Sequence, residues 1–77
     1  MLETAYFLIS LDRKTPAEVA RHVRRVAGVI EAVVTMGEVD IIAVAQADGT
    51  RGFPTISTAL QQIEGVAKVV TCVVIRP

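Results

Sequence analysis

An internal repeat sets the strongest limit on how this chain of 77 residues can fold. The segment Val26-Ala27-Gly28-Val29 is matched 37 residues later by Ile63-Glu64-Gly65-Val66, and branched aliphatic residues follow each copy. Glycine commonly ends a helix and branched residues favour strands, so each copy marks a junction from helix to strand. The chain is therefore predicted to consist of two halves, each with the order strand, helix, strand.

Hydrophobic patterns place the strands of these halves, and strands are predicted at residues 5–11, 29–36, 39–47 and 66–75. Between the second and third strands, Gly37-Glu38 fits a two-residue hairpin turn with glycine at its first central position. Two interleaved halves of this kind form the ferredoxin-like βαββαβ fold, an α+β architecture, as a single domain of residues 1–77. Right-handed crossovers then place both helices on one face of a four-stranded antiparallel sheet.

Both helices have recognisable ends. The first is predicted to begin at Thr15, which can act as its cap, with Glu18 as the acid of a capping box. Gly28 is predicted to end it. The second helix is predicted to begin within residues 50–54 and to end at Gly65. Each helix thus lies between the two strands of its own half.

Both faces of the predicted sheet are apolar. In the first strand, Phe7 and Ile9 point to one face, whereas Tyr6 and Leu8 point to the other. The two helices can cover only one of these faces. The hydrophobic content of 52% also exceeds what a single domain this small can bury. We therefore expect a second subunit to cover the other face.

Charge and cysteine content exclude several classes of protein. Eight basic and eight acidic side chains give a net charge of zero, so no overall field attracts DNA or a membrane. The first residues lack the features of a signal peptide, and no apolar run approaches the roughly 18 residues of a membrane span. The single cysteine, Cys72, favours a reducing compartment. A cytoplasmic location without membrane contact is expected.

No arrangement typical of an enzyme, a metal site or a cofactor site is present. His22 is the sole histidine and lies among arginines on the predicted polar face of its helix, where a solvated role is expected. Cys72 lies in an apolar strand and is interpreted as a buried structural thiol. The sequence has no CxxC motif and no glycine-rich phosphate loop. The chain is therefore predicted not to be an enzyme and to need no cofactor.

Two polar residues in the strands are candidates for ligand binding. Asp40 lies near the start of an apolar strand, where a partly buried carboxylate needs a partner. It either accepts backbone N–H groups at the turn or pairs with a cationic group, such as the α-amino group of a ligand. Thr71 is the only hydroxyl residue of the last strand, and cross-strand packing and ligand binding are both open for it.

Several segments together resemble the ligand-binding domain of the Lrp/AsnC family, also called the RAM domain. They are Val26–Val29, Thr35–Ala43, Ile63–Val66, Thr71 and Val73–Ile75. The resemblance extends over residues 5–75, and the hairpin around Gly37 and Asp40 is one of its more specific parts. The chain departs from the family at Val39, where an aromatic residue is usual, and at Val69, where relatives often carry a hydroxyl.

The resemblance implies a regulatory domain of amino-acid metabolism. Family members pair through their sheets into dimeric α+β barrels, and the dimers assemble into tetramers, octamers or larger rings. Amino acids bind between neighbouring dimers around the hairpin, which implies Gly37, Glu38, Asp40 and Thr71 as ligand-binding residues here. Full-length relatives carry a helix-turn-helix domain before this one. The resemblance thus implies a stand-alone member that binds no DNA directly and can co-assemble with full-length Lrp/AsnC regulators.

Three other functions remain open. An ACT-like module shares the strand order and also binds amino acids, but the glycine of its first strand-to-helix loop is missing, because Asp12-Arg13-Lys14-Thr15 stands there. A small enzyme of the dimeric α+β barrel kind would need an acid, a base or a cofactor ligand inside the barrel. An assembly protein without a ligand is the third alternative. Thermal-shift measurements with the twenty amino acids would separate them.

Overall fold

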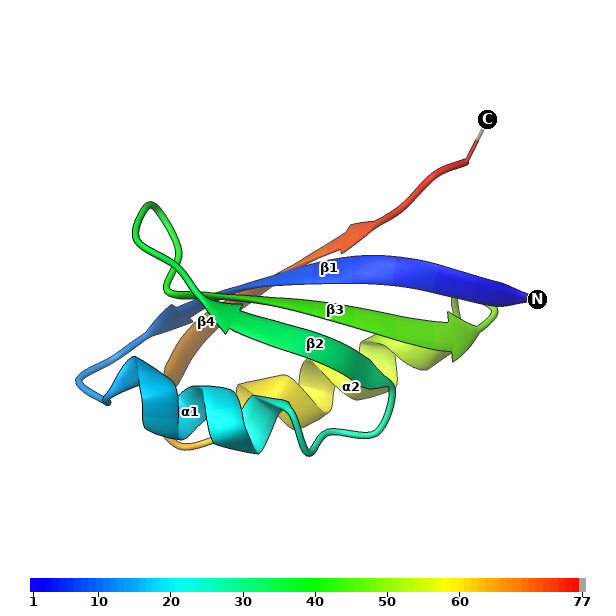
Figure 1. Cartoon of the computed structure of the whole chain (residues 1–77). Coiled ribbons are helices and arrows are strands. Elements are labelled where there is room, and N and C mark those ends of the chain that lie inside the picture. Colours follow the sequence, from blue (N-terminus) through cyan, green and yellow to red (C-terminus); the bar gives the residue numbers. More distant parts are fainter. Residues whose placement is uncertain (77) are drawn as a thin grey trace.

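The computed structural model describes residues 1–76 and has the predicted order of elements. The elements are β1 (Leu2–Leu11), α1 (Pro16–Val23), β2 (Val29–Val34), β3 (Ile41–Asp48), α2 (Gly52–Gln61) and β4 (Val66–Val73). The strands form one antiparallel sheet in the order β2-β3-β1-β4. Figure 1 shows α1 and α2 side by side on one face of this sheet. The fold is therefore the ferredoxin-like arrangement that the repeat predicted.

The hydrophobic core lies between the sheet and the two helices. Its largest fully buried side chains are Phe7, Ile9, Val19, Val23, Ile41 and Leu60. The rings of Phe7 in β1 and Phe53 in α2 pack edge to face, with their centroids 6.3 Å apart. This contact joins a central strand to a helix of the other half. Neither helix of residues 1–76 is long and apolar enough to cross a membrane.

The two repeat glycines occupy equivalent positions in the fold. Gly28 and Gly65 have φ angles of 98° and 96°, a region that glycine adopts without steric cost. The Gly28 carbonyl accepts a hydrogen bond from the Gln46 N–H at 2.8 Å, and the Gly65 carbonyl accepts one from the Asp12 N–H at 2.7 Å. Each repeat glycine is therefore bonded to the end of a strand that belongs to the other half.

Helix α1 is shorter than predicted and is capped differently. It ends at Val23, because the next residues turn more tightly and the Val26 N–H donates to the Val23 carbonyl. Thr15 does occupy the N-cap position, but its side chain makes no capping hydrogen bond. The predicted capping box is therefore wrong. The backbone N–H of Glu18 donates to the Thr15 carbonyl instead, at 3.0 Å.

The connection between β2 and β3 is longer than the predicted two-residue turn. It spans residues 35–40, from the end of β2 at Val34 to the start of β3 at Ile41. A two-residue turn with glycine first requires a positive φ there, and Gly37 does not have one. The Thr35 N–H donates to the Asp40 carbonyl at 2.9 Å and closes this wider loop.

The sheet face opposite the helices is uncovered in the single chain. We call this surface the open face; it consists of Tyr6, Leu8, Val33, Ile42, Val44, Val70 and Cys72. These side chains are neighbours across the strands, and Tyr6 is 43% exposed. The prediction that both faces are apolar is confirmed. The prediction of a buried thiol is wrong for the single chain, because Cys72 lies on this face and is exposed.

Candidate functional site

Three of the four predicted binding residues lie together on the β2–β3 loop, which rises from the sheet on the side away from the helices (Figure 1). Gly37 and Glu38 are exposed, and Asp40 is half-buried at the base of the loop. Thr71 lies elsewhere, on the edge strand β4 and opposite Phe7 of β1. Since β1 separates β3 from β4, the strand spacing alone puts Thr71 about 10 Å from β3. A single chain does not bring Thr71 to the loop.

Asp40 is held by hydrogen bonds to two neighbouring segments. Its Oδ2 accepts the backbone N–H of Leu11 at 2.8 Å, and its own N–H donates to the Ile9 carbonyl at 2.9 Å. Its carbonyl accepts the Thr35 N–H. Of the two interpretations of Asp40, the one in which its carboxylate accepts a backbone N–H is therefore right about the type of donor. That donor belongs to the end of β1 and not to the turn.

The second carboxylate oxygen of Asp40 remains available to an outside donor. Among residues 1–76, the only hydrogen bond to this carboxylate is the one from Leu11 to Oδ2. No buried side-chain oxygen of these residues lacks a partner, so Oδ1 reaches the solvent. A carboxylate has about four lone-pair sites, and an ammonium group can therefore bind Oδ1 without displacing the Leu11 N–H.

Gly37 differs from the repeat glycines because nothing inside the chain requires a glycine there. A Cβ atom at Gly28 would collide with Ile56, and one at Gly65 would collide with Lys14. A Cβ atom at Gly37 would meet nothing within 4 Å. The φ angle of Gly37 is also accessible to other residues. The open space leaves the Gly37 backbone accessible to another molecule.

Thr35 closes the loop and was not among the residues that the sequence singled out. Its hydroxyl donates to the Val39 carbonyl at 2.8 Å, in addition to the bond from its backbone N–H to Asp40. The signal that could have identified it is its position, because hydroxyl residues at the junction of a strand and a turn often bond to nearby backbone groups.

Exposed apolar side chains continue from the loop along the edge strand β2. Met36 in the loop is fully exposed, and Ile30 and Val34 of β2 are 60% and 48% exposed. Apolar surface of this kind is typical of a contact with another molecule.

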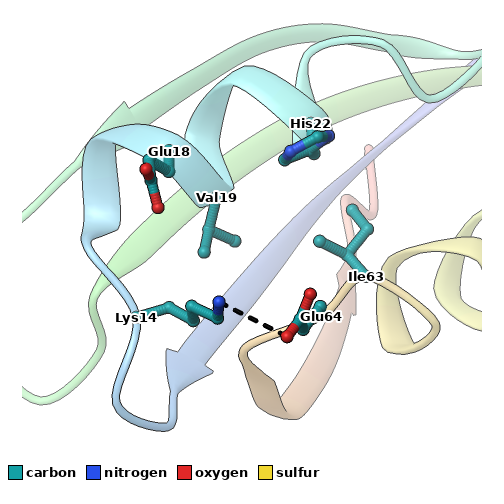
Figure 2. A pocket seen from close by; sticks show the side chains of 6 residues that line it. All are labelled: Lys14, Glu18, Val19, His22, Ile63 and Glu64. Carbon is teal, nitrogen blue, oxygen red and sulfur yellow. Dashed lines mark ion pairs between the residues drawn. The ribbon is translucent and has the colours of Figure 1, made fainter.

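A separate hollow of about 210 Å³ lies on the helix side, next to the turn that joins α2 to β4. It is lined by Lys14, Glu18, Val19, His22, Ile63 and Glu64. Figure 2 shows Lys14 reaching across the opening toward Glu64, with Nζ and Oε2 3.3 Å apart. None of the four predicted binding residues lines this hollow. Residues 1–76 also contain no group of three His, Cys, Asp or Glu side chains that could hold a metal ion.

Several solved structures share this fold. A crystal structure of a Thermus thermophilus protein superposes with a TM-score of 0.89 at 18% identity, covering 97% of this chain and 95% of that one. A Neisseria meningitidis transcriptional regulator in complex with L-Met superposes with a TM-score of 0.81 at 19% identity, covering 96% of this chain and 50% of the regulator. AsnC of E. coli superposes with a TM-score of 0.85 at 17% identity, covering 97% of this chain and 52% of AsnC. This chain thus spans about half the length of the two regulators.

Sequence comparison assigns the family. A search of curated proteins found no match. The model of the Lrp/AsnC ligand binding domain, however, matches residues 4–77. The match includes both helices, all of β2, β3 and β4, and β1 except for its first two residues, as well as the loop with Gly37 and Asp40. The chain therefore belongs to the Lrp/AsnC ligand-binding domain family.

Proposed function

We propose that this chain is an amino-acid-binding, oligomerising domain that acts in the cytoplasm in the transcriptional regulation of amino-acid metabolism. Its family consists of ligand-binding domains of transcriptional regulators, which supports a regulatory role and not an enzymatic one. The Neisseria regulator with the same fold was solved in complex with L-Met, which supports an amino acid as the ligand. Co-assembly with a full-length Lrp/AsnC regulator would connect ligand binding by this domain to action on DNA.

The observation that supports this proposal is that one loop carries both Gly37, which has empty space beside it, and Asp40, of which only one carboxylate oxygen is hydrogen-bonded. The ammonium group of an amino acid would bind Asp40 Oδ1, which reaches the solvent. A hydrogen bond between two charged groups is stronger than a neutral one, so this contact would contribute much of the affinity. The empty space beside Gly37 would let the ligand approach the backbone. Glu38, exposed next to Gly37, would border the site.

Thr71 would join the site only from another copy of the chain. Within one chain, β1 lies between the strand of Thr71 and the loop. Thr71 is nevertheless exposed on an edge strand, where a neighbouring copy can reach it. A site shared between copies would therefore connect ligand binding to assembly, from dimers to octamers or larger rings.

The open face supports the first step of this assembly. Packing two open faces together would remove the apolar side chains of both sheets from water. The dimer would then have helices on both outer surfaces and a shared apolar interior, which is the arrangement of an α+β barrel dimer.

Thermal-shift measurements with the twenty amino acids test the proposed function, starting with L-methionine. A ligand that binds only the native state, at 100 times its dissociation constant, stabilises by about 2.7 kcal/mol. For a domain of this size, that stabilisation raises the melting temperature by roughly 10 °C or more. Calorimetric titration with the best amino acid should then give saturable binding. If no amino acid raises the melting temperature, the alternative of an assembly protein without a ligand is favoured.

A further inference from the structure

We infer that Thr35 is a positioning residue of the amino-acid site, and that its hydroxyl fixes the direction of the Asp40 carboxylate. The inference rests on the proposed function, because it concerns the same loop. It adds a residue that makes its contribution without touching the ligand.

The peptide group between Val39 and Asp40 is held at both of its ends. Its carbonyl oxygen accepts the Thr35 hydroxyl at 2.8 Å, and its N–H donates to the Ile9 carbonyl at 2.9 Å. A peptide group is planar, so two bonds at opposite ends fix its orientation. One of these bonds depends on a side chain, and that side chain belongs to Thr35.

The orientation of this peptide group helps to fix the position of the Asp40 Cα atom, from which the side chain extends. The carboxylate is fixed a second time by the bond from the Leu11 N–H to Oδ2. With both constraints present, Oδ1 points in one direction before any ligand arrives. A preorganised group binds more tightly, because less conformational freedom is lost on binding.

Removing the hydroxyl would disturb the loop more than the core. Thr35 lies outside the buried core cluster, and its backbone bond to the Asp40 carbonyl can be made by any residue except proline. The Val39 carbonyl would lose its donor and the peptide could then rotate. The predicted loss is therefore one of ligand affinity, with the sheet retained.

Three substitutions test this inference. Thr35→Val removes the hydroxyl and nearly keeps the shape, Thr35→Ala is a second hydroxyl-free variant in case valine impairs folding, and Thr35→Ser keeps the hydroxyl. Each variant is titrated calorimetrically with L-methionine and with the amino acid that gives the largest thermal shift. The hydroxyl-free variants should bind about tenfold more weakly, the equivalent of one hydrogen bond. Thr35→Ser should bind like the wild type.

A measurement without ligand accompanies the titration. Amide hydrogen exchange at Leu11 and Asp40 should be about tenfold faster in the hydroxyl-free variants and unchanged in Thr35→Ser, since local opening controls exchange. Wild-type affinity in a folded hydroxyl-free variant overturns the role of Thr35 and leaves the proposed function intact. If the wild type binds none of the twenty amino acids, the proposed function fails, and the positioning role fails with it.

Discussion

At the scale of single residues, we propose that the two carboxylate oxygens of Asp40 serve two different purposes. Oδ2 accepts the backbone N–H at the end of β1, which links the loop to the sheet. Oδ1 reaches the solvent and is the proposed contact for the ligand. A substitution that removes the charge but keeps an oxygen acceptor can therefore separate the two contributions.

The first prediction concerns the charge of Asp40. Asp40→Asn should weaken amino-acid binding by about 1.5–3 kcal/mol, because a hydrogen bond to a charged group contributes that much. Folding should be preserved, since the amide oxygen can still accept the Leu11 N–H. Asp48→Asn is the matched control, because Asp48 lies at the other end of β3 and bonds to the N-terminal amino group. Equal affinities of wild type and Asp40→Asn in calorimetry would limit Asp40 to its structural bond.

The second prediction concerns Gly37. Gly37→Ala should leave the free energy of unfolding unchanged or raise it by about 0.4–1 kcal/mol, because a Cβ atom meets nothing and restricts the unfolded chain. The same Cβ should weaken ligand binding by filling the approach to the loop. Urea denaturation and calorimetric titration measure the two effects. Unchanged affinity in the stable variant would show that the ligand does not approach the Gly37 backbone.

At the scale of elements, the sequence predicted the order of strands and helices but not all of their ends. The helical spacing continues past Val23 to Val26, yet the chain tightens there into turns with bonds between residues three apart. Gly37, Glu38 and Asp40 could be predicted together because they are neighbours in the sequence. The location of Thr71 relative to them depends on how strands far apart in the sequence are ordered in the sheet, which the order of neighbouring residues does not determine.

Arg24 provides a link between two elements that can be tested. Its Nη2 and Nε donate to the Ala32 carbonyl of β2 at 2.9 and 3.2 Å. Because β2 is an edge strand, this contact also covers part of its exposed backbone.

The third prediction is that Arg24→Met lowers the free energy of unfolding by about 0.5–1.5 kcal/mol in urea denaturation, because hydrogen bonds are lost while the aliphatic stem is kept. Arg25→Met is the control, since the exposed Arg25 side chain makes no hydrogen bond within residues 1–76 and its substitution should change stability by less than about 0.5 kcal/mol. Equal effects of the two substitutions would contradict a specific role for Arg24.

At the scale of the whole molecule, the open face is the main reason to expect that the protein is not a monomer. Ile42 lies between Leu8 of β1 and Val33 of β2, so its side chain is surrounded by apolar neighbours on this face. A charge introduced at Ile42 would therefore lie among apolar side chains on the face that the proposed dimer buries.

The fourth prediction follows from this geometry. The wild type should be a dimer or a larger even-numbered assembly in light scattering at micromolar concentrations. Ile42→Lys should shift it toward the monomer, because lysine is costly to bury without a partner. Thr58→Lys, on the exposed side of α2, should leave the assembly unchanged. A well-folded wild-type monomer at low micromolar concentration would refute the proposed dimer.

The hydrogen bonds that the two repeat glycines accept from the opposite halves have a consequence for the cooperativity of folding. Gly28 accepts its bond from Gln46, and Gly65 accepts its bond from Asp12, so each half supplies the donor that completes the other. The sheet is interleaved in the same way, because β1 pairs with β3 and β4 of the second half. We therefore expect that neither half folds on its own. Two peptides produced by cutting the chain at Gly49 would stay unstructured apart and would reconstitute the native sheet only by fragment complementation.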